Sequence, residues 1–154
     1  MGSLTRQAYL ADRLVDPAGS YVDVLGDASR RARDAELLVA ADPVGALLGT
    51  VTVCTPGSPL AEVSRPGELE FRMLAVHPHA RHRGVGRALV DAVLTRADQR
   101  GASRVVLSSA EHMSSAHRLY TRLGFTRLPE RDWYPLPGLL LLAFGRSREW
   151  RSVP

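Results

Sequence analysis

The chain has 154 residues, 45% of them hydrophobic, and a formal net charge of +4. This length and composition indicate a single domain over residues 1–154 with one hydrophobic core. The sequence shows no apolar run near the roughly 20 residues of a membrane span and no signal or lipidation motif, so we expect no membrane partner. Cys54 is the single cysteine, which excludes an internal disulfide and favours a reducing, cytoplasmic location.

The positive charge comes from arginine, because the chain contains no lysine. Lys, Asn and Ile are all absent, and since their codons are AT-rich we infer a GC-rich bacterial genome. Outside a loop at 81–87 the basic residues are dispersed, so we expect no nucleic-acid partner. A nucleic-acid reader would need that loop and would show steeply salt-dependent binding.

Helices and a hairpin are predicted in the first third of the chain. Apolar residues at helical spacing favour a helix over Leu4–Val15 and a second one from a cap at Ser20 to Asp34. Strands at 36–41 and 46–55 flank a turn and form a hairpin, which a Pro- and Gly-rich loop follows.

The remaining elements alternate between strands and helices. We expect a central strand at 69–76, a helix from Val85 to about Arg100, a strand at 104–109 and a helix at 114–123. Last come a strand at 126–133, a turn at 135–138 and a strand at 139–145. A helix between the strands at 69–76 and 104–109 implies a parallel crossover, so the fold class is α/β (α+β) with a mixed sheet.

Two glycines mark the junction between the central strand and its helix. Gly84 and Gly86 have no Cβ atoms, so backbone N–H groups at the helix N-terminus can close in on a ligand. Arg81, Arg83 and Arg87 flank these glycines, which favours a phosphorylated ligand. The alternative is a tight turn with solvated arginines.

Spacing excludes two commoner phosphate motifs. A dinucleotide fingerprint needs a small residue where Leu89 stands, and a Walker loop needs a lysine. The remaining Arg-x-x-Gly-x-Gly pattern resembles the acyl-CoA pyrophosphate loop of the GNAT family of N-acetyltransferases. A second segment, Ala116-x-x-Leu119-Tyr120-x-x-x-Gly124-Phe125, is similar to that family's strand–helix–Gly-Phe segment.

The resemblance covers residues 36–145 and implies a fold and an activity. The fold would be a mixed, mostly antiparallel sheet with a splayed parallel pair and flanking helices. The activity would be the transfer of an acetyl group from acetyl-CoA to a primary amine by direct attack in a ternary complex. The family begins with a strand before its first helix, and the sequence shows no such strand.

The resemblance also implies how coenzyme A (acetyl-CoA) is held. Backbone groups at a bulge in the central strand would pair with the pantetheine arm, and donors in the glycine loop would bind the pyrophosphate. The family's Asn seven residues before the tyrosine is replaced by Met113, and Ser114 or Ser115 is the candidate substitute. The cofactor-binding set is Leu74, Ala75, Val76, Arg81, His82, Arg83, Gly84, Val85, Gly86, Arg87, Ala88, Ser115 and Tyr120.

Two residues are the catalytic candidates. Tyr120 matches the family's proton donor, and a phenol is protonated at neutral pH. Glu70 lies where some members keep a glutamate, and burial would raise its pKa toward that of a useful base. The alternative for Glu70 is an exposed carboxylate paired with Arg72. Water is a further candidate for the base, and the reserve side chains are Glu68, Glu111 and His112.

The acceptor is constrained only in outline. Aromatic and acidic residues should wall its side of the site, and they suit a small-molecule or peptide amine. The set is Tyr21, Glu111, Trp133 and Tyr134. A rival hypothesis is a non-catalytic acyl-CoA-binding sensor or assembly module. A homodimer is expected through exposed strand edges, and we expect no metal site at the histidines.

Overall fold

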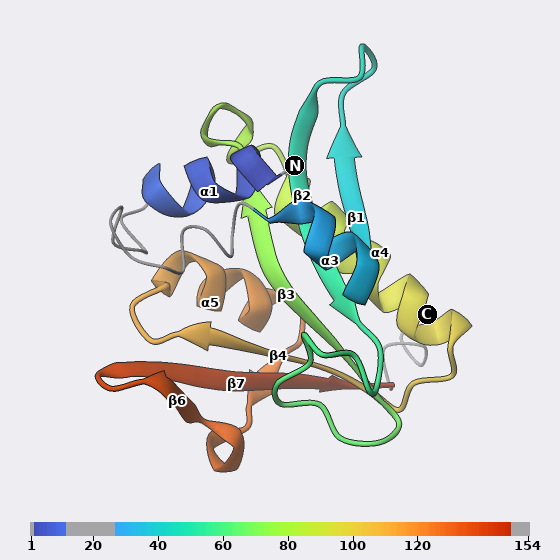
Figure 1. Ribbon diagram of the computed structural model, residues 1–154, viewed down its shortest axis with the longest axis vertical. Coiled ribbons are helices and arrows are strands. Elements are labelled where there is room, and N and C mark those ends of the chain that lie inside the picture. Colours follow the sequence, from blue (N-terminus) through green and yellow to red (C-terminus); the bar gives the residue numbers. More distant parts are fainter. Residues whose placement is uncertain (1, 12–26, 149–154) are drawn as a thin grey trace.

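The computed structural model describes residues 2–11 and 27–148 (Figure 1). The described helices and strands, in chain order, are α1 (Gly2–Ala11), α3 (Ala28–Asp34), β1 (Glu36–Ala41), β2 (Leu47–Cys54), β3 (Glu68–Val76), η1 (Pro78–Ala80), α4 (Val85–Gln99), β4 (Arg104–Ala110), α5 (Ser114–Arg122), β5 (Thr126–Arg127), η2 (Pro129–Arg131), β6 (Trp133–Leu136) and β7 (Leu139–Ser147). The predicted helix at 4–15 is found over its described part. The proposed cap Ser20 and the candidate site residue Tyr21 lie outside the described residues, and α3 is capped instead by Asp27, whose Oδ1 accepts the Arg30 N–H at 2.9 Å.

One sheet organises the described chain, with strand order β1-β2-β3-β4-β7-β5 and with β6 also paired to β7. All pairings are antiparallel except β3 with β4, which run parallel and are joined through α4. The predicted fold class and the predicted parallel crossover are therefore confirmed.

The predicted strand at 126–133 is wrong in its middle. β5 ends at Arg127, the 3₁₀ turn η2 occupies Pro129–Arg131, and β6 extends to Leu136 into the predicted turn. Pro129 has no N–H to donate to a ladder and its fixed φ suits the first position of a helical turn. The strand is broken there into two short pieces that both pair with β7.

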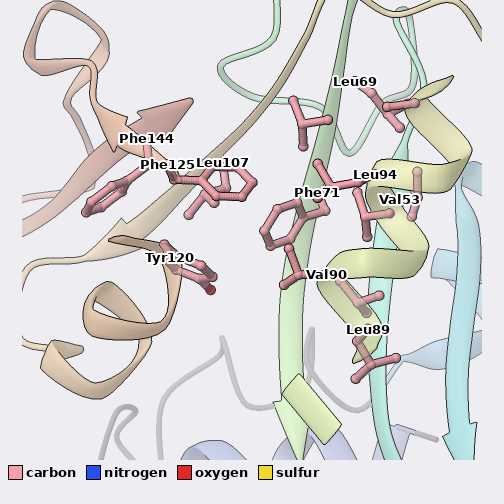
Figure 2. Close-up of a cluster of buried hydrophobic side chains, with 14 of the residues drawn as sticks. Val53, Leu69, Phe71, Leu89, Val90, Leu94, Leu107, Tyr120, Phe125 and Phe144 are labelled. Atoms are coloured by element: carbon pink, nitrogen blue, oxygen red, sulfur yellow. The ribbon is translucent and has the colours of Figure 1, made fainter. Parts of the chain in front are cut away.

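Helices cover both faces of the sheet. Leu4 and Ala8 of α1 pack on Ala75 of β3, and in Figure 1 α1 lies in front of the sheet while α4 lies behind it. The main core forms on the α4 face, where α4 and α5 side chains meet Val53 of β2, Phe71 of β3 and Phe144 of β7 (Figure 2). Neighbouring residues along a strand point to opposite faces, so Glu70 of β3 lies on the α1 face and Phe71 on the α4 face.

Gly49 of β2 brings the sheet close to α4. A Cβ at this position would lie 2.9 Å from the Ala75 carbonyl oxygen, 2.9 Å from Val85 Cγ1 and 3.0 Å from Leu89 Cδ1. We expect Gly49→Ala to lower the free energy of unfolding by about 1–3 kcal/mol, because overpacking forces the backbone apart. Urea unfolding followed by circular dichroism measures the loss, and a midpoint equal to that of the wild type would contradict this packing.

Candidate functional site

The central strand β3 carries a bulge and then parts from β4. Between Thr50 and Thr52 of β2 the register with β3 shifts, so that Met73 and Leu74 together oppose one residue. Met73 has a φ of 54°, an uncommon conformation for a residue with a side chain. The parallel ladder with β4 ends at Glu70–Val106, and Figure 1 shows the two strands diverging beyond it. From Phe71 to Val76 the β4 side of this strand has no strand partner among the described residues.

The predicted glycine loop forms the N-terminus of α4. Gly84 is the N-cap residue with a φ of 77°, and His82 before it has a φ of 61°. The Ala88 N–H donates to the Gly84 carbonyl, so the preceding N–H groups of the helix have no acceptor within it. A chain in this conformation presents several backbone donors at the positive end of a helix, which is where an anion binds well.

Gly86 is the point where three elements meet. A Cβ added to it would lie 3.2 Å from Leu119 Cδ2 of α5 and 3.8 Å from Val76 Cγ2 at the end of β3. The glycine loop, the strand after its bulge and α5 are thus adjacent in space. The structure brings together three parts of the predicted cofactor site.

The flanking arginines have different surroundings. The Arg83 and Arg87 side chains are exposed, and Arg87 lies 4.0 Å from Asp91 one helical turn along. Arg81 is half-buried and donates to the Ala8 carbonyl of α1 at 3.2 Å. Of the three, Arg83 and Arg87 present their guanidinium groups to solvent beside the glycine loop.

Tyr120 lies on α5 inside an aromatic cluster. Its ring centroid is 5.9 Å from that of Phe71, 6.1 Å from that of Phe125 and 5.9 Å from that of Phe144. Figure 2 shows its hydroxyl pointing from α5 toward β3. Within the described chain this hydroxyl has no hydrogen-bond partner, and burial raises the pKa of Tyr120 above its ordinary value. The phenol therefore stays protonated across the physiological range and is free to donate.

Glu70 is buried and already occupied by backbone donors. Its side chain is 0% exposed, and its Oε2 accepts the Glu62 N–H at 2.8 Å and the Val63 and Ser64 N–H groups at 3.3 Å. Burial raises the pKa of Glu70, while those N–H groups oppose the rise. The alternative of an exposed carboxylate paired with Arg72 is wrong, because Arg72 pairs with Glu62 at 2.6 Å.

The reserve bases are placed differently. Glu68 pairs with Arg131 at 2.6 Å, with both side chains 7% exposed, whereas Glu111 and His112 are exposed after β4. On the acceptor side Trp133 is half-buried and its Nε1 lies 3.4 Å from Ser108 Oγ, while Tyr134 is 63% exposed. The Glu111 N–H donates to the Leu140 carbonyl of β7 at 3.2 Å.

The sequence matches the model of the Acetyltransferase (GNAT) family over residues 6–125. The chain belongs to the GNAT family. The family predicted from the two motifs is thereby confirmed, and the bulged, splayed strand and the glycine loop of this GNAT chain are the features that the resemblance implied.

Two kinds of acetyltransferase are among the similar curated proteins. Mycothiol acetyltransferase of Salinispora tropica is 43% identical over 97 residues, which is 60% of this chain and 29% of that protein. N-acetylaspartate synthetase of Danio rerio is 38% identical over 71 residues, 46% of this chain and 25% of that protein. The chain therefore spans about a quarter to a third of the length of these curated relatives.

Solved structures show the same fold. A GNAT-family acetyltransferase from Desulfovibrio desulfuricans superposes with a TM-score of 0.72 at 19% identity, covering 95% of this chain and 91% of that one. Nourseothricin acetyltransferase superposes with a TM-score of 0.60 at 28% identity, covering 75% of this chain and 66% of that one.

A pair that the sequence analysis missed joins α5 to β4 in this GNAT chain. His117 Nε2 lies 3.2 Å from Ser109 Oγ, and the His117 ring packs on Phe144 with centroids 5.1 Å apart. Met113, in place of the family's Asn, is the N-cap of α5 without a side-chain cap, and its Sδ lies 3.5 Å from the same Ser109 Oγ. The candidate substitute Ser115 is exposed, and its Oγ accepts from Arg118 at 3.1 Å.

The His117 pair predicts a pH effect on stability. Burial, with Arg127 and His112 nearby, lowers the pKa of His117 below 6.5. The unfolded chain then binds the proton more readily, so the stability from neutral His117 is present above pH 6.5 and is lost as the pH falls through the lowered pKa. We expect His117→Gln to lose less stability than the wild type between about pH 7 and pH 5. Urea midpoints at the two pH values measure this, and equal losses would contradict it.

The described residues contain neither a helix that could span a membrane nor a cluster of metal ligands. No described helix is long and apolar enough to cross a membrane. Over residues 2–11 and 27–148, no group of three or more His, Cys, Asp or Glu side chains is placed to hold a metal ion. His77 and His79 stack on each other with ring centroids 5.1 Å apart, and Cys54 is buried, which raises its pKa to about 12.

Proposed function

We propose that this chain is an acetyl-CoA-dependent N-acetyltransferase that acts on a primary amine. The observation that carries the proposal is the meeting of the α4 N-terminus, the bulged end of β3 and α5 at Gly86. An anion-binding helix end, free strand backbone and a protonated phenol thus lie in one region. Membership of the GNAT family supports this use of them.

The residues present fit acetyl-CoA. Backbone N–H groups from His82 to Arg87 would bind its pyrophosphate, with Arg83 and Arg87 adding positive charge. The predicted Ala88 N–H is not among these donors, because it is bonded to the Gly84 carbonyl. The strand backbone of Leu74 to Val76 that lacks a β4 partner would hold its pantetheine arm in place of a strand. When bound, the coenzyme supplies a thioester, an acyl group already activated for attack by an amine.

Tyr120 is proposed as the general acid. As the amine nitrogen bonds to the thioester carbon, the carbon–sulfur bond would break and Tyr120 would give its phenolic proton to the departing sulfur. The amine would lose one proton to the base, and solvent would return a proton to the Tyr120 oxygen. The raised pKa of Tyr120 keeps that proton in place until sulfur develops charge. A backbone N–H of β3 near Val76 would stabilise the carbonyl oxygen.

The two faces of the sheet would serve different partners. Tyr120 packs on Phe71 and so lies on the α4 face, whereas Trp133 contacts Ser108, which shares the opposite face with Glu70. Since the ladder between β3 and β4 ends at Glu70, a thioester held there can be reached from both faces. The acceptor would therefore approach from the side of Trp133 and α1.

The acceptor class is proposed only as a small-molecule or peptide amine. The relatives named for mycothiol and N-acetylaspartate support a small molecule. The base that takes the proton from the amine is Glu70 or water, and substitution of Glu70 distinguishes the two. A homodimer and a cytoplasmic location stay predictions.

A transfer screen tests this function. The protein is incubated with acetyl-CoA and a panel of alkyl diamines, amino sugars, amino acids and tripeptides, and the released thiol is measured. We expect amine-dependent thiol release with at least one class. Coenzyme binding without release for any class would instead favour the acyl-CoA-binding module.

A further inference from the structure

We propose that Glu70 is a positioning residue that holds residues 62–64 as a wall of the acceptor side, and not the group that takes the proton from the amine. The inference rests on the proposed function, because only a transferase has an acceptor side. The part of the proposal that concerns structure is that Glu70 binds residues 62–64. This part rests on contacts within the chain and is tested separately.

The first observation is the convergence of three consecutive amides on one carboxylate. The N–H groups of Glu62, Val63 and Ser64 all point at Glu70 Oε2, at 2.8, 3.3 and 3.3 Å, and the Val63 N–H also lies 3.3 Å from Oε1. A carboxylate that accepts several backbone N–H groups is stabilised as the anion and has those lone pairs in use. Burial raises the pKa of Glu70, but these N–H groups oppose the rise and occupy the lone pairs that would have to take a proton.

Two arginine side chains also bind the same loop. Arg72, next but one along β3, donates to the Leu60 carbonyl at 2.9 Å and pairs with the Glu62 carboxylate at 2.6 Å. Arg131 of η2 donates to the Val63 carbonyl at 3.3 Å. The segment 60–64 is thus bonded at both its N–H and its C=O groups, although it contains no helix or strand.

The loop lies on the face that the acceptor would use. Glu70 pairs in register with Val106, so its side chain shares a face with that of Ser108 two residues further along β4. Ser108 contacts Trp133, and Arg131, which holds Val63, comes two residues before Trp133. The loop and the predicted acceptor wall are therefore linked through η2.

These contacts give Glu70 of β3 a structural role and leave proton removal to another group. Glu70 is 0% exposed because the loop covers it, so an amine on this face would meet the loop and not the carboxylate. A general base must come within hydrogen-bond reach of its proton, directly or through one water. Water then takes the proton, and Glu70 sets the shape of the wall that the acceptor contacts.

Hydrogen exchange on the wild type is the first arm of the test. We expect the amides of Glu62, Val63 and Ser64 to exchange at least tenfold more slowly than unstructured peptide amides. Glu70→Gln removes the negative charge and one of the two acceptor oxygens, so its remaining oxygen accepts more weakly, and we expect that protection to fall at least tenfold. Glu62→Gln is the matched control, because it weakens the pair with Arg72 but leaves the backbone N–H of residue 62 in place. In this variant the protection of the three amides should stay within about twofold of the wild type.

The second part of the test measures kcat and the acceptor KM with the amine that is most active in the transfer screen. For Glu70→Gln we expect the acceptor KM to rise about tenfold, with kcat within about threefold and its pH profile unchanged. A kcat loss of 100-fold or more with loss of the acidic limb of the profile would overturn the proposal and assign Glu70 as the base. Fast exchange of the three amides in the wild type would also overturn it. If no amine is turned over, the proposed function fails while the exchange arm still decides the hold on the loop.

Discussion

Replacing Tyr120 by Phe is expected to lower turnover by about 10²–10⁴-fold while leaving the affinity for acetyl-CoA within about twofold. The factor is the usual contribution of a positioned proton donor. The ring packs against Phe71, Phe125 and Phe144, and phenylalanine keeps those contacts. Because the hydroxyl has no partner within the described chain, its loss breaks no bond that holds the fold. Single-turnover thiol release, with calorimetry for the coenzyme, measures both quantities.

A packing variant in the same cluster separates chemistry from structure. Phe125→Leu disturbs the aromatic contacts of Tyr120 but keeps its hydroxyl. We expect a lower unfolding midpoint and a turnover loss below about tenfold. If Phe125→Leu slowed turnover as much as Tyr120→Phe, the proton-donor role would be contradicted, and packing of α5 would account for both variants.

Replacing Arg131 by Met is expected to give the largest loss of stability, about 3–5 kcal/mol. Arg131 and Glu68 are each 7% exposed and 2.6 Å apart, and removing one partner leaves the other charge buried. Glu68 would keep only Arg104 at 3.8 Å and the Arg65 N–H at 2.8 Å. Urea unfolding measures the loss, which is a large fraction of the roughly 5–15 kcal/mol that holds a domain folded.

The double variant Glu68→Gln/Arg131→Met tests the cause. Removing both charges removes the unpaired carboxylate, so we expect the double variant to be more stable than Arg131→Met alone. Additive losses would mean that the two side chains stabilise the fold independently. That result would contradict the account of them as one buried pair.

The sequence could predict the parts of the site that local chemistry dictates. Gly84 and Gly86 occupy a strand-to-helix junction where a side chain would be strained or crowded, and the segment around Tyr120 carries helical spacing. Each of these features is encoded by residues a few positions apart in the sequence, so it can be recognised without the fold. The family, the sheet class and the parallel pair followed from them.

Other features have no such pattern. The family resemblance implied a bulge in the central strand, but no local pattern indicates that it lies at Met73, a residue with a side chain at positive φ. The three amides on Glu70 belong to a loop without periodicity, so their convergence appears only when β3 is in place. The break at Pro129 did have a signal, because proline cannot donate to the ladder, and the predicted strand ran through it.

The His117–Ser109 pair shows a different limit. The two residues are eight apart in sequence and lie on a strand and the helix that follows it. Their contact depends on how α5 packs on β4, and neither residue type alone indicates it. Met113 signalled only that the family's usual contact was missing.

Calorimetry with acetyl-CoA and with free coenzyme A tests the central claim most directly. The claim is that the amides around Gly84 and Gly86 bind the coenzyme's pyrophosphate beside the open edge of β3. We predict saturable heat with both ligands, and weaker binding when Gly86 is replaced by Val, because its side chain would meet Leu119 and Val76. No heat from folded protein with either ligand would contradict the account.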